Sequence, residues 1–276
     1  MLDVNKTEPM MQTGRRPLEG RTAIVTGSTS GIGLGIARAL AQNGAAVMLN
    51  GFGDPMEIEQ QRTALAHEND VDVAYDSADM SNRDAIRLMV DRAVARFGQV
   101  DIVVNNAGIQ HVAPIGEFPP AKWDAILAID LSSAFHLVQA TFEPMAKRGY
   151  GRVINVASAH GLIASPFKSA YVAAKHGMVG LTKVIALEGA ERGVTANAIC
   201  PGYVWTPLVE KQIDDQAKSH NIARDAVIRD VFLKNQPTKR FATVEEMGAL
   251  AVFLCSDSAA SITGTALPVD GGWTAH

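Results

Sequence analysis

Short apolar runs rich in β-branched residues alternate along this chain with longer segments whose apolar positions recur at the spacing of an α-helix. The runs at residues 22–26, 45–49, 71–75, 102–104, 153–156 and 195–199 predict strands, and residues 266–269 predict a seventh. Strands that alternate with helices pack as a parallel sheet covered by helices on both faces. The pattern therefore predicts an α/β fold with a doubly wound parallel sheet.

Two parts of the chain fall outside this alternation. Residues 1–20 mix charged and polar residues with glycine and proline and show no periodicity, which predicts a flexible N-terminal tail. A single domain is predicted over residues 21–276, because nothing in that stretch marks a second core. Within it, residues 203–240 are polar, helix-prone and longer than an ordinary connection, which predicts a helical lid.

Composition narrows the classes of function. The chain has 276 residues, a formal net charge of −4 and scattered basic residues, so neither nucleic acid nor a membrane is a predicted partner. No uninterrupted apolar run approaches the roughly 18 residues of a membrane helix and no secretory signal is visible, so a cytoplasmic protein is expected. Cys200 and Cys255 lack redox or metal-site spacing, so we predict buried thiols and no metal site.

A glycine-rich turn, Gly27-Ser-Thr-Ser-Gly31-Ile-Gly33, joins the first predicted strand to the first predicted helix. Free N–H groups and the positive dipole end at such a helix start suit a pyrophosphate. Gly27 permits the turn, Gly31 lets the backbone approach a phosphate, and Gly33 lets the helix pack closely. The spacing also occurs in turns that only reverse the chain, but its position after the first strand favours a Rossmann-type dinucleotide site. The residues assigned to this part of the site are Gly27, Thr29, Ser30, Gly31, Ile32 and Gly33.

The end of the second strand bears on the choice of dinucleotide. A 2′-phosphate on the adenosine ribose needs a cationic partner, and neither the glycine turn nor residues 50–54 contain Lys or Arg. The predicted cofactor is therefore NAD rather than NADP. Phe52 is expected against the adenine, with ordinary packing as the alternative. Asp79 is expected to accept from the adenine amino group, with a solvated loop carboxylate as the alternative, and Met80 is assigned to the same site.

A Ser followed by Tyr-x-x-x-Lys is the candidate catalytic group. Ser158 follows the fifth predicted strand, and Tyr171 and Lys175 lie four residues apart on the next helix, which places them on one face. Oxidising an alcohol requires a base for the hydroxyl proton, and an ammonium beside a phenol favours the phenolate. Tyr171 is therefore the predicted acid/base, Lys175 its activator and a ligand of the nicotinamide ribose, and Ser158 the donor to the substrate oxygen.

This order of motifs resembles the short-chain dehydrogenase/reductase family from residue 21 to the C-terminus. The motifs that carry the resemblance are Thr26-Gly-Ser-Thr-Ser-Gly-Ile-Gly33, Asn105-Asn-Ala-Gly108, Ser158, Tyr171-Val-Ala-Ala-Lys175, Asn197 and Pro201-Gly202. The resemblance implies that the cofactor is also contacted by Asn106, Gly108, Pro201, Gly202, Val204 and Thr206. Members are usually dimers or tetramers, so a homotetramer is expected.

One position departs from the family pattern. Members usually carry Asn in the long helix after the fourth strand, where it is thought to hold a water that links the catalytic Lys to solvent. The residue here is Asp130, just before Leu131. We expect Asp130 to keep a backbone contact and to add a charge, which bears on proton release from the catalytic group.

Several polar side chains are placed by the resemblance in a substrate pocket. Two amides, an imidazole and an ammonium are a suitable set for a small carboxylate: Gln110, His160, Lys168 and Gln212. With the run Asp270-Gly-Gly-Trp273 they resemble one branch, the bacterial D-3-hydroxybutyrate dehydrogenases. That resemblance implies that these four residues hold the carboxylate of 3-hydroxybutyrate or acetoacetate and that Trp273 packs on the methyl end. Tyr203 stands where related enzymes often carry Trp.

Two other classes of function stay open on the sequence. One is another enzyme of the same fold, such as a 3-oxoacyl carrier-protein reductase or a sugar alcohol dehydrogenase, which needs an open channel or hydroxyl-binding groups. The other is an NAD-binding regulator without turnover, for which Asp130 is the one supporting residue. The enzyme interpretation predicts both cofactor binding and turnover, whereas the regulator predicts binding alone.

Overall fold

The computed structural model of the chain describes residues 16–220 and 222–275. Its centre is a seven-stranded sheet in which every pairing is parallel, in the order β3-β2-β1-β4-β5-β6-β7. The strands are β1 (Thr22–Val25), β2 (Ala46–Asn50), β3 (Val73–Asp76), β4 (Ile102–Asn105), β5 (Gly151–Val156), β6 (Val194–Pro201) and β7 (Ala266–Val269). All seven predicted strands are present, and the predicted doubly wound sheet is confirmed.

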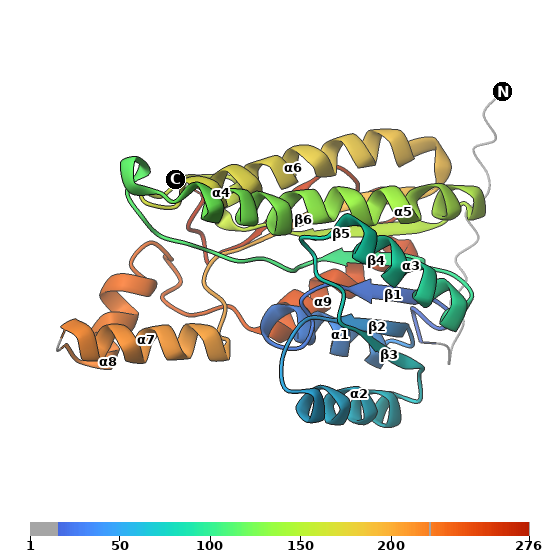
Figure 1. Cartoon of the computed structure of the whole chain (residues 1–276), viewed down its shortest axis with the longest axis horizontal. Coiled ribbons are helices and arrows are strands. Elements are labelled where there is room, and N and C mark those ends of the chain that lie inside the picture. Colours follow the sequence, from blue (N-terminus) through green and yellow to red (C-terminus); the bar gives the residue numbers. More distant parts are fainter. Residues whose placement is uncertain (1–15, 221, 276) are drawn as a thin grey trace.

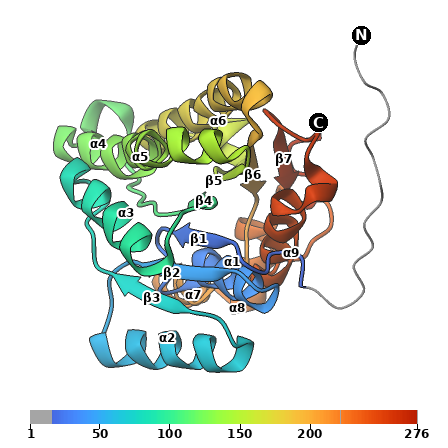
Figure 2. The same ribbon diagram turned by 90° about the vertical axis from the view of Figure 1, so that its right-hand side faces the viewer.

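Helices cover both faces of this sheet, which explains why β1, β4, β5 and β6 are buried along their whole length. The helices of the sheet are α1 (Gly31–Gln42), α2 (Pro55–Asn69), α3 (Arg83–Phe97), α4 (Pro120–Leu127), α5 (Ser133–Arg148), α6 (Ser169–Gly189) and α9 (Val244–Cys255). Figure 2 shows α3, α5 and α6 on one side and α1 and α9 on the other. Each layer has its own core, one around Ile36 and Met247 and the other around Ile86 and Leu137.

The strand order fixes the place of a ligand crevice. β1 pairs with β2 on one side and β4 on the other, so successive connections leave this point of the sheet in opposite directions. Ligands of open α/β sheets bind outside the carboxyl ends of the strands at such a switch point. The glycine turn after β1 and the Asn106 loop after β4 meet there, because the Asn106 amide donates to the carbonyls of Thr26 and Gly27.

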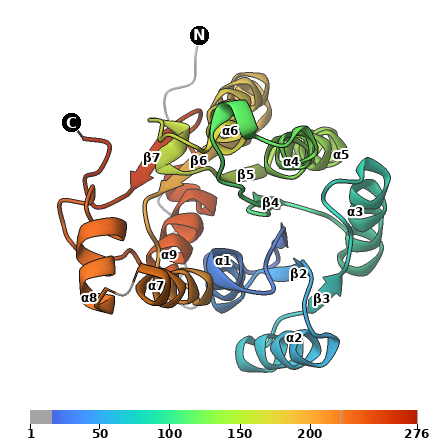
Figure 3. The ribbon, with the colours of Figure 1, turned by 60° about the vertical axis from the view of Figure 1, so that its left-hand side comes forward.

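Residues 203–240 are largely helical, as predicted. They contain α7 (Pro207–His220), α8 (Arg224–Val227) and a π-helical turn (Ile228–Phe232), and they lie at one end of the molecule in Figures 1 and 3. Ile213, Val227 and Phe232 form a small core of their own. Arg224 ties α8 to α7 through Asp214, at 2.8 Å. This segment is therefore a separate helical unit that borders the carboxyl ends of the strands.

The predicted start of the domain at residue 21 is a few residues late. Leu18 is 1% exposed and belongs to the core around Ile36, and its N–H donates to the Asn43 carbonyl at 2.8 Å. A single apolar residue in a polar run shows no periodicity, so its burial cannot be read from the pattern. Residues 1–15 of the predicted tail lie outside the described residues.

The helical run Pro120–Arg148 has the length and apolar composition of a membrane-crossing helix. In this fold it is α4, a π-helical turn (Ala128–Ser132) and α5, and it packs over the sheet. Leu137 and Met145 of α5 lie in the same core as Val103 and Val153 of the strands. The length and apolar composition of this helical run are therefore those of a core helix in the α/β fold.

Candidate active site

The glycine turn has the geometry that a pyrophosphate loop requires. Gly27 and Gly31 have positive φ angles of 60° and 56°, which side chains rarely adopt. A Cβ on Gly33 would lie 2.3 Å from the Gly27 carbonyl oxygen. Each of these glycines is therefore required by backbone conformation or close approach, as the sequence predicted.

The start of α1 points free donors at the crevice. Its N-cap, Ser30, makes no side-chain capping bond, and no acidic residue lies in its first turn. The first N–H groups of a helix lack partners inside the helix and, together with the dipole, attract an anion. Ser30, Gly31 and Ile32 line the main cleft, so these groups are available to a phosphate there.

A second cavity of about 260 Å³ adjoins the glycine turn on the side of β2 and β3. Its lining includes Thr29 of the glycine turn and three residues that the sequence assigned to the adenosine end of the cofactor, Phe52, Asp79 and Met80. Phe52 is 68% exposed, so its ring has a free face. The residues described as lining the cavity include no Lys or Arg.

Asp79 lies three residues beyond the end of β3 instead of closing it. Its carboxylate accepts from the N–H and the hydroxyl of Ser81, both at 2.8 Å. These bonds hold the carboxylate at the rim of the second cavity and leave acceptor positions open.

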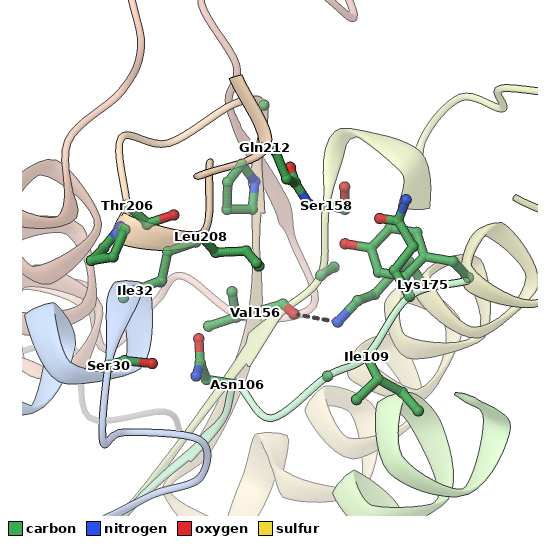
Figure 4. A pocket seen from close by; sticks show the side chains of 18 residues that line it. Ser30, Ile32, Asn106, Ile109, Val156, Ser158, Lys175, Thr206, Leu208 and Gln212 are labelled. Atoms are coloured by element: carbon green, nitrogen blue, oxygen red, sulfur yellow. Dashed lines mark hydrogen bonds between the residues drawn. The ribbon is translucent and has the colours of Figure 1, made fainter. Parts of the chain in front are cut away.

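The main cleft has a volume of about 580 Å³ and brings the catalytic candidates together. Ser158, Tyr171 and Lys175 all line it, opposite the start of α1 (Figure 4). Lys175 is 3% exposed and its Nζ donates to the Val156 carbonyl at 3.0 Å. The Nζ lies 5.6 Å from the centre of the Tyr171 ring. The helix therefore presents the phenol and the ammonium to one cleft, as the four-residue spacing predicted.

The contacts of the Ser158 hydroxyl leave it able to donate a hydrogen bond into the cleft. It is the N-cap of a short 3-10 turn (Ala159–Gly161), and its Oγ accepts from the His160 N–H at 3.1 Å. Because that bond uses Oγ as an acceptor, the hydroxyl proton remains free for an oxygen in the cleft.

Asp130 lies beside this group and is fully buried in the π-helical turn. Its Oδ1 accepts from the Ile109 N–H at 2.8 Å, and its Oδ2 is 3.7 Å from the Lys175 Nζ. Burial raises the pKa of the Asp130 carboxyl, and the Lys175 charge opposes that shift. The expected backbone contact is present, and the carboxyl group lies next to the Lys175 ammonium.

The predicted substrate residues divide into two groups. Gln110 and Gln212 line the main cleft, and in Figure 4 Gln212 reaches from α7 toward Ser158. His160, Lys168, Tyr203 and Trp273 are not in the described lining of that cleft. They lie behind Ser158 and Tyr171 as described next.

Aromatic rings form a wall next to the catalytic phenol. The His160 ring lies 6.1 Å from the Tyr171 ring and 5.2 Å from the Trp273 ring, both edge to face. Tyr203 stacks on Trp273 at 5.7 Å. The three rings therefore pack as one cluster beside the catalytic phenol.

The two cationic candidates behave differently. Burial lowers the pKa of His160 to about 4, so its ring is neutral at pH 7, and Nε2 shares a hydrogen bond with Ser165 at 2.7 Å. Burial also lowers the pKa of the Lys168 ammonium. Of these two side chains, the neutral His160 ring can offer only an uncharged hydrogen bond.

Most of the remaining cofactor candidates lie on the main cleft. Asn106, Gly108, Pro201, Gly202 and Thr206 line it. Val204 does not appear in the described lining: it is 3% exposed and pairs with Ala242 in an isolated bridge.

Two buried amides that organise the site were missed from the sequence. Asn50 accepts from the Gly27 N–H at 3.3 Å and donates to the carbonyls of Asp76 and Ala78, so it ties the glycine turn to β3. Gln236 is 1% exposed, accepts from the Tyr203 N–H at 2.5 Å and donates to the Arg240 carbonyl. Asn50 ends the apolar run of β2 and Gln236 stands in a polar stretch, and neither pattern shows that the amide side chain is buried.

Comparison with known proteins agrees with this geometry. A protein-family model described as enoyl-(acyl carrier protein) reductase matches residues 27–274. The chain belongs to the short-chain dehydrogenase/reductase family. It is 57% identical over 256 residues to a D-beta-hydroxybutyrate dehydrogenase of Rhizobium meliloti (strain 1021), covering 93% of this chain and 99% of that one. It is 54% identical over 259 residues to a D-beta-hydroxybutyrate dehydrogenase of Cupriavidus necator, covering 94% and 100%.

A solved structure confirms the fold class at lower identity. A crystal structure described as a short-chain alcohol dehydrogenase from Sinorhizobium meliloti 1021 superposes with a TM-score of 0.83 at 33% identity, covering 94% of this chain and 98% of that one. The family uses a nicotinamide cofactor. The chain is thus a short-chain oxidoreductase, and Ser158, Tyr171 and Lys175 line the same cleft as the end of the glycine turn.

Proposed function

We propose that this chain interconverts (R)-3-hydroxybutyrate and acetoacetate with NAD as the hydride carrier. The observation that carries the proposal is the convergence of Ser158, Tyr171 and Lys175 on one cleft with Gln110 and Gln212. The high identity to two D-beta-hydroxybutyrate dehydrogenases over nearly the whole chain supports the substrate.

The chain's own residues account for the proton half of the reaction. The Ser158 hydroxyl donates to the substrate oxygen, and Tyr171 as phenolate removes the hydroxyl proton. Lys175, fixed by the Val156 carbonyl, places its positive charge by the phenol. The bound nicotinamide supplies the acceptor for the hydride that leaves the same carbon.

The carboxylate end of the substrate sets the specificity. We assign its recognition to Gln110, Gln212 and Lys168, with His160 as a neutral partner and Trp273 against the methyl group. Lys168 acts on the His160 ring electrostatically, which supports its position at this end of the site. An ammonium and amides in a cleft that excludes water discriminate strongly against an uncharged alcohol.

We propose NAD rather than NADP. The support is the cavity at the adenosine end, whose described lining of Thr29, Phe52, Asp79 and Met80 with neighbouring residues contains no cation for a 2′-phosphate. The Asp79 carboxylate at its rim would also repel a phosphate.

A homotetramer in the cytoplasm completes the proposal. The outer sides of α5 and α6 expose large apolar residues, among them Phe135, Val184 and Leu187. Exposed apolar side chains on neighbouring helices are typical of a subunit interface. The support for the cytoplasmic location is the core role of the one apolar helical run found in the described residues.

The test is an absorbance assay for reduced nicotinamide with four combinations, NAD or NADP with (R)- or (S)-3-hydroxybutyrate. We expect turnover with NAD and the (R) form. Turnover only in the reverse direction with NADPH and a 3-oxoacyl thioester would contradict the proposal and favour a carrier-protein reductase. Tight NADH binding without turnover of any alcohol would favour a regulator.

A further inference from the structure

Asp130 is a buried carboxyl group with one satisfied and one unsatisfied oxygen. Its Oδ1 holds the Ile109 N–H at 2.8 Å, while Oδ2 has no hydrogen-bond partner. Buried acceptors without a hydrogen bond are rare in folded proteins. The contact with Ile109 needs only one acceptor oxygen, so it does not by itself explain why this buried position carries a carboxyl group.

The unsatisfied oxygen faces the catalytic ammonium. Oδ2 lies 3.7 Å from the Lys175 Nζ, and both side chains are at least 96% buried. The Nζ donates one of its three hydrogens to the Val156 carbonyl, at 3.0 Å, and at 3.7 Å it acts on Asp130 through its charge. At this distance and depth, water screens the interaction little.

Lys175 is the charged group that acts on Asp130 within the described chain. The loop from Asn106 to Gln110 carries no titratable side chain, and the charged residues of α4, Lys122 and Asp124, are exposed. On α5, the His136 ring is influenced by Arg83. From α6, Tyr171 and Lys175 face the cleft.

We infer that Asp130 is a titratable positioning residue for the reaction: its carboxylate offsets the Lys175 charge and so controls the pH at which Tyr171 becomes a base. The ionised carboxylate weakens the field that stabilises the Tyr171 phenolate. When the carboxyl takes up a proton, the Lys175 charge acts on the phenol unopposed. The kinetic part of this inference rests on the proposed dehydrogenation, whereas the electrostatic part does not.

Coupling of this kind has a defined signature. Two groups that influence one another titrate as a pair, so the phenolate forms over a wider pH range than a single group would give. Replacing Asp130 with Asn keeps an Oδ1 acceptor for the Ile109 N–H, puts an N–H₂ group in place of Oδ2 and removes the charge and the titratable proton. A purely structural Asp130 therefore predicts an unchanged titration in Asp130→Asn.

Phenolate absorbance tests the electrostatic part without any substrate. The chain has four tyrosines, and burial raises the pKa of Tyr75, Tyr150 and Tyr203. The Tyr171 signal is isolated by subtracting the titration of a Tyr171→Phe variant in each background. We expect its midpoint to fall by about one pH unit in Asp130→Asn, the scale of a unit charge about 10–12 Å away at an effective dielectric constant of about 20.

The pH dependence of kcat/KM tests the kinetic part. In Asp130→Asn we expect the rising limb of the kcat/KM profile to move to lower pH by about the same amount and to become steeper. Below the midpoint, kcat/KM should therefore be up to about tenfold higher than in the wild-type chain. The plateau should change less than about twofold. Asp101→Asn is the matched control, because Asp101 is 1% exposed but precedes β4 at the opposite edge of the sheet.

The outcomes separate the inference from the proposed function. An unmoved midpoint in both titrations, or a shift to higher pH, would overturn the role of Asp130. An absence of turnover in the wild-type chain would refute the proposed function, and the absorbance titration would still decide the role of Asp130. Equal NADH affinity in the wild-type chain and Asp130→Asn shows that the variant is folded.

Discussion

Individual side chains in this site have roles that depend on their surroundings. Tyr171 and Lys175 were assigned by their spacing, and the structure adds that Lys175 is fixed by the Val156 carbonyl and faced by Asp130. His160 was expected as one of a set of donors. Burial makes its ring neutral at pH 7, so the charge for a carboxylate falls to Lys168.

Removing the catalytic hydroxyl should abolish most turnover and leave the cofactor site intact. For Tyr171→Phe we expect kcat to fall by about 10²–10⁴-fold, the usual contribution of a positioned acid or base. NADH affinity, followed by its fluorescence, should change little. A variant that keeps more than about a tenth of the activity would exclude Tyr171 as the acid/base.

The neutral His160 makes the fold sensitive to acid. Its pKa in the folded chain, about 4, lies below the ordinary value of 6.5, so the unfolded chain binds the extra proton first as the pH falls. Its stabilisation is complete above about pH 6.5 and is lost toward pH 4. Between pH 7.5 and pH 5, the free energy of unfolding measured with urea should fall by about 2 kcal/mol more in the wild-type chain than in His160→Asn. Equal losses in the two proteins would contradict this role.

The glycine turn tolerates no side chain at its third glycine. In Gly33→Ala the new Cβ would lie 2.3 Å from the Gly27 carbonyl oxygen, so either the turn or α1 must move. We expect a lower melting temperature and at least about tenfold weaker NADH binding, because the donors at the helix start lose their alignment. Gly180→Ala on α6 is the matched control, since a Cβ there meets nothing within 4 Å. Normal NADH binding by Gly33→Ala would show that the turn does not hold the pyrophosphate.

Elements carry the residues of the site to the same edge of the sheet. The loops after β1, β4, β5 and β6 all end there because the strands are parallel. The helical segment that contains α7 borders the same edge and brings Gln212 to the cleft. Its own core around Ile213 and Phe232 allows α7 and α8 to act as one unit.

A contact between Gln212 and the carboxylate should be visible in both kinetic constants. If the segment closes over the substrate through this contact, Gln212→Ala should raise KM and lower kcat, each by about threefold or more. Asp215→Ala, which changes an exposed residue of the same helix, should alter neither KM nor kcat. Unchanged constants in Gln212→Ala would remove α7 from substrate binding.

The whole molecule leaves apolar surface on the outside of α5 and α6. Leu187 is 79% exposed on α6, and Phe135 is 46% exposed on α5. If these helices pack against another copy, Leu187→Arg should give a smaller assembly by light scattering, because a charge would be buried at the interface. Met56→Arg on α2, where Met56 is 72% exposed, is the control on the other face of the sheet. An unchanged mass in Leu187→Arg would place the interface elsewhere.

The amino-acid sequence by itself determined the seven strands, the doubly wound architecture, the glycine turn and the Ser-Tyr-Lys group, because each has a local signature of period, turn chemistry or spacing. Tertiary structure decided the burial of Leu18 and the roles of Asn50 and Gln236, each of which has a partner 23 or more residues away. It also decided that His160 is neutral and that the free oxygen of Asp130 faces Lys175. These properties depend on which distant segments exclude water from a side chain, and no local pattern contains that information.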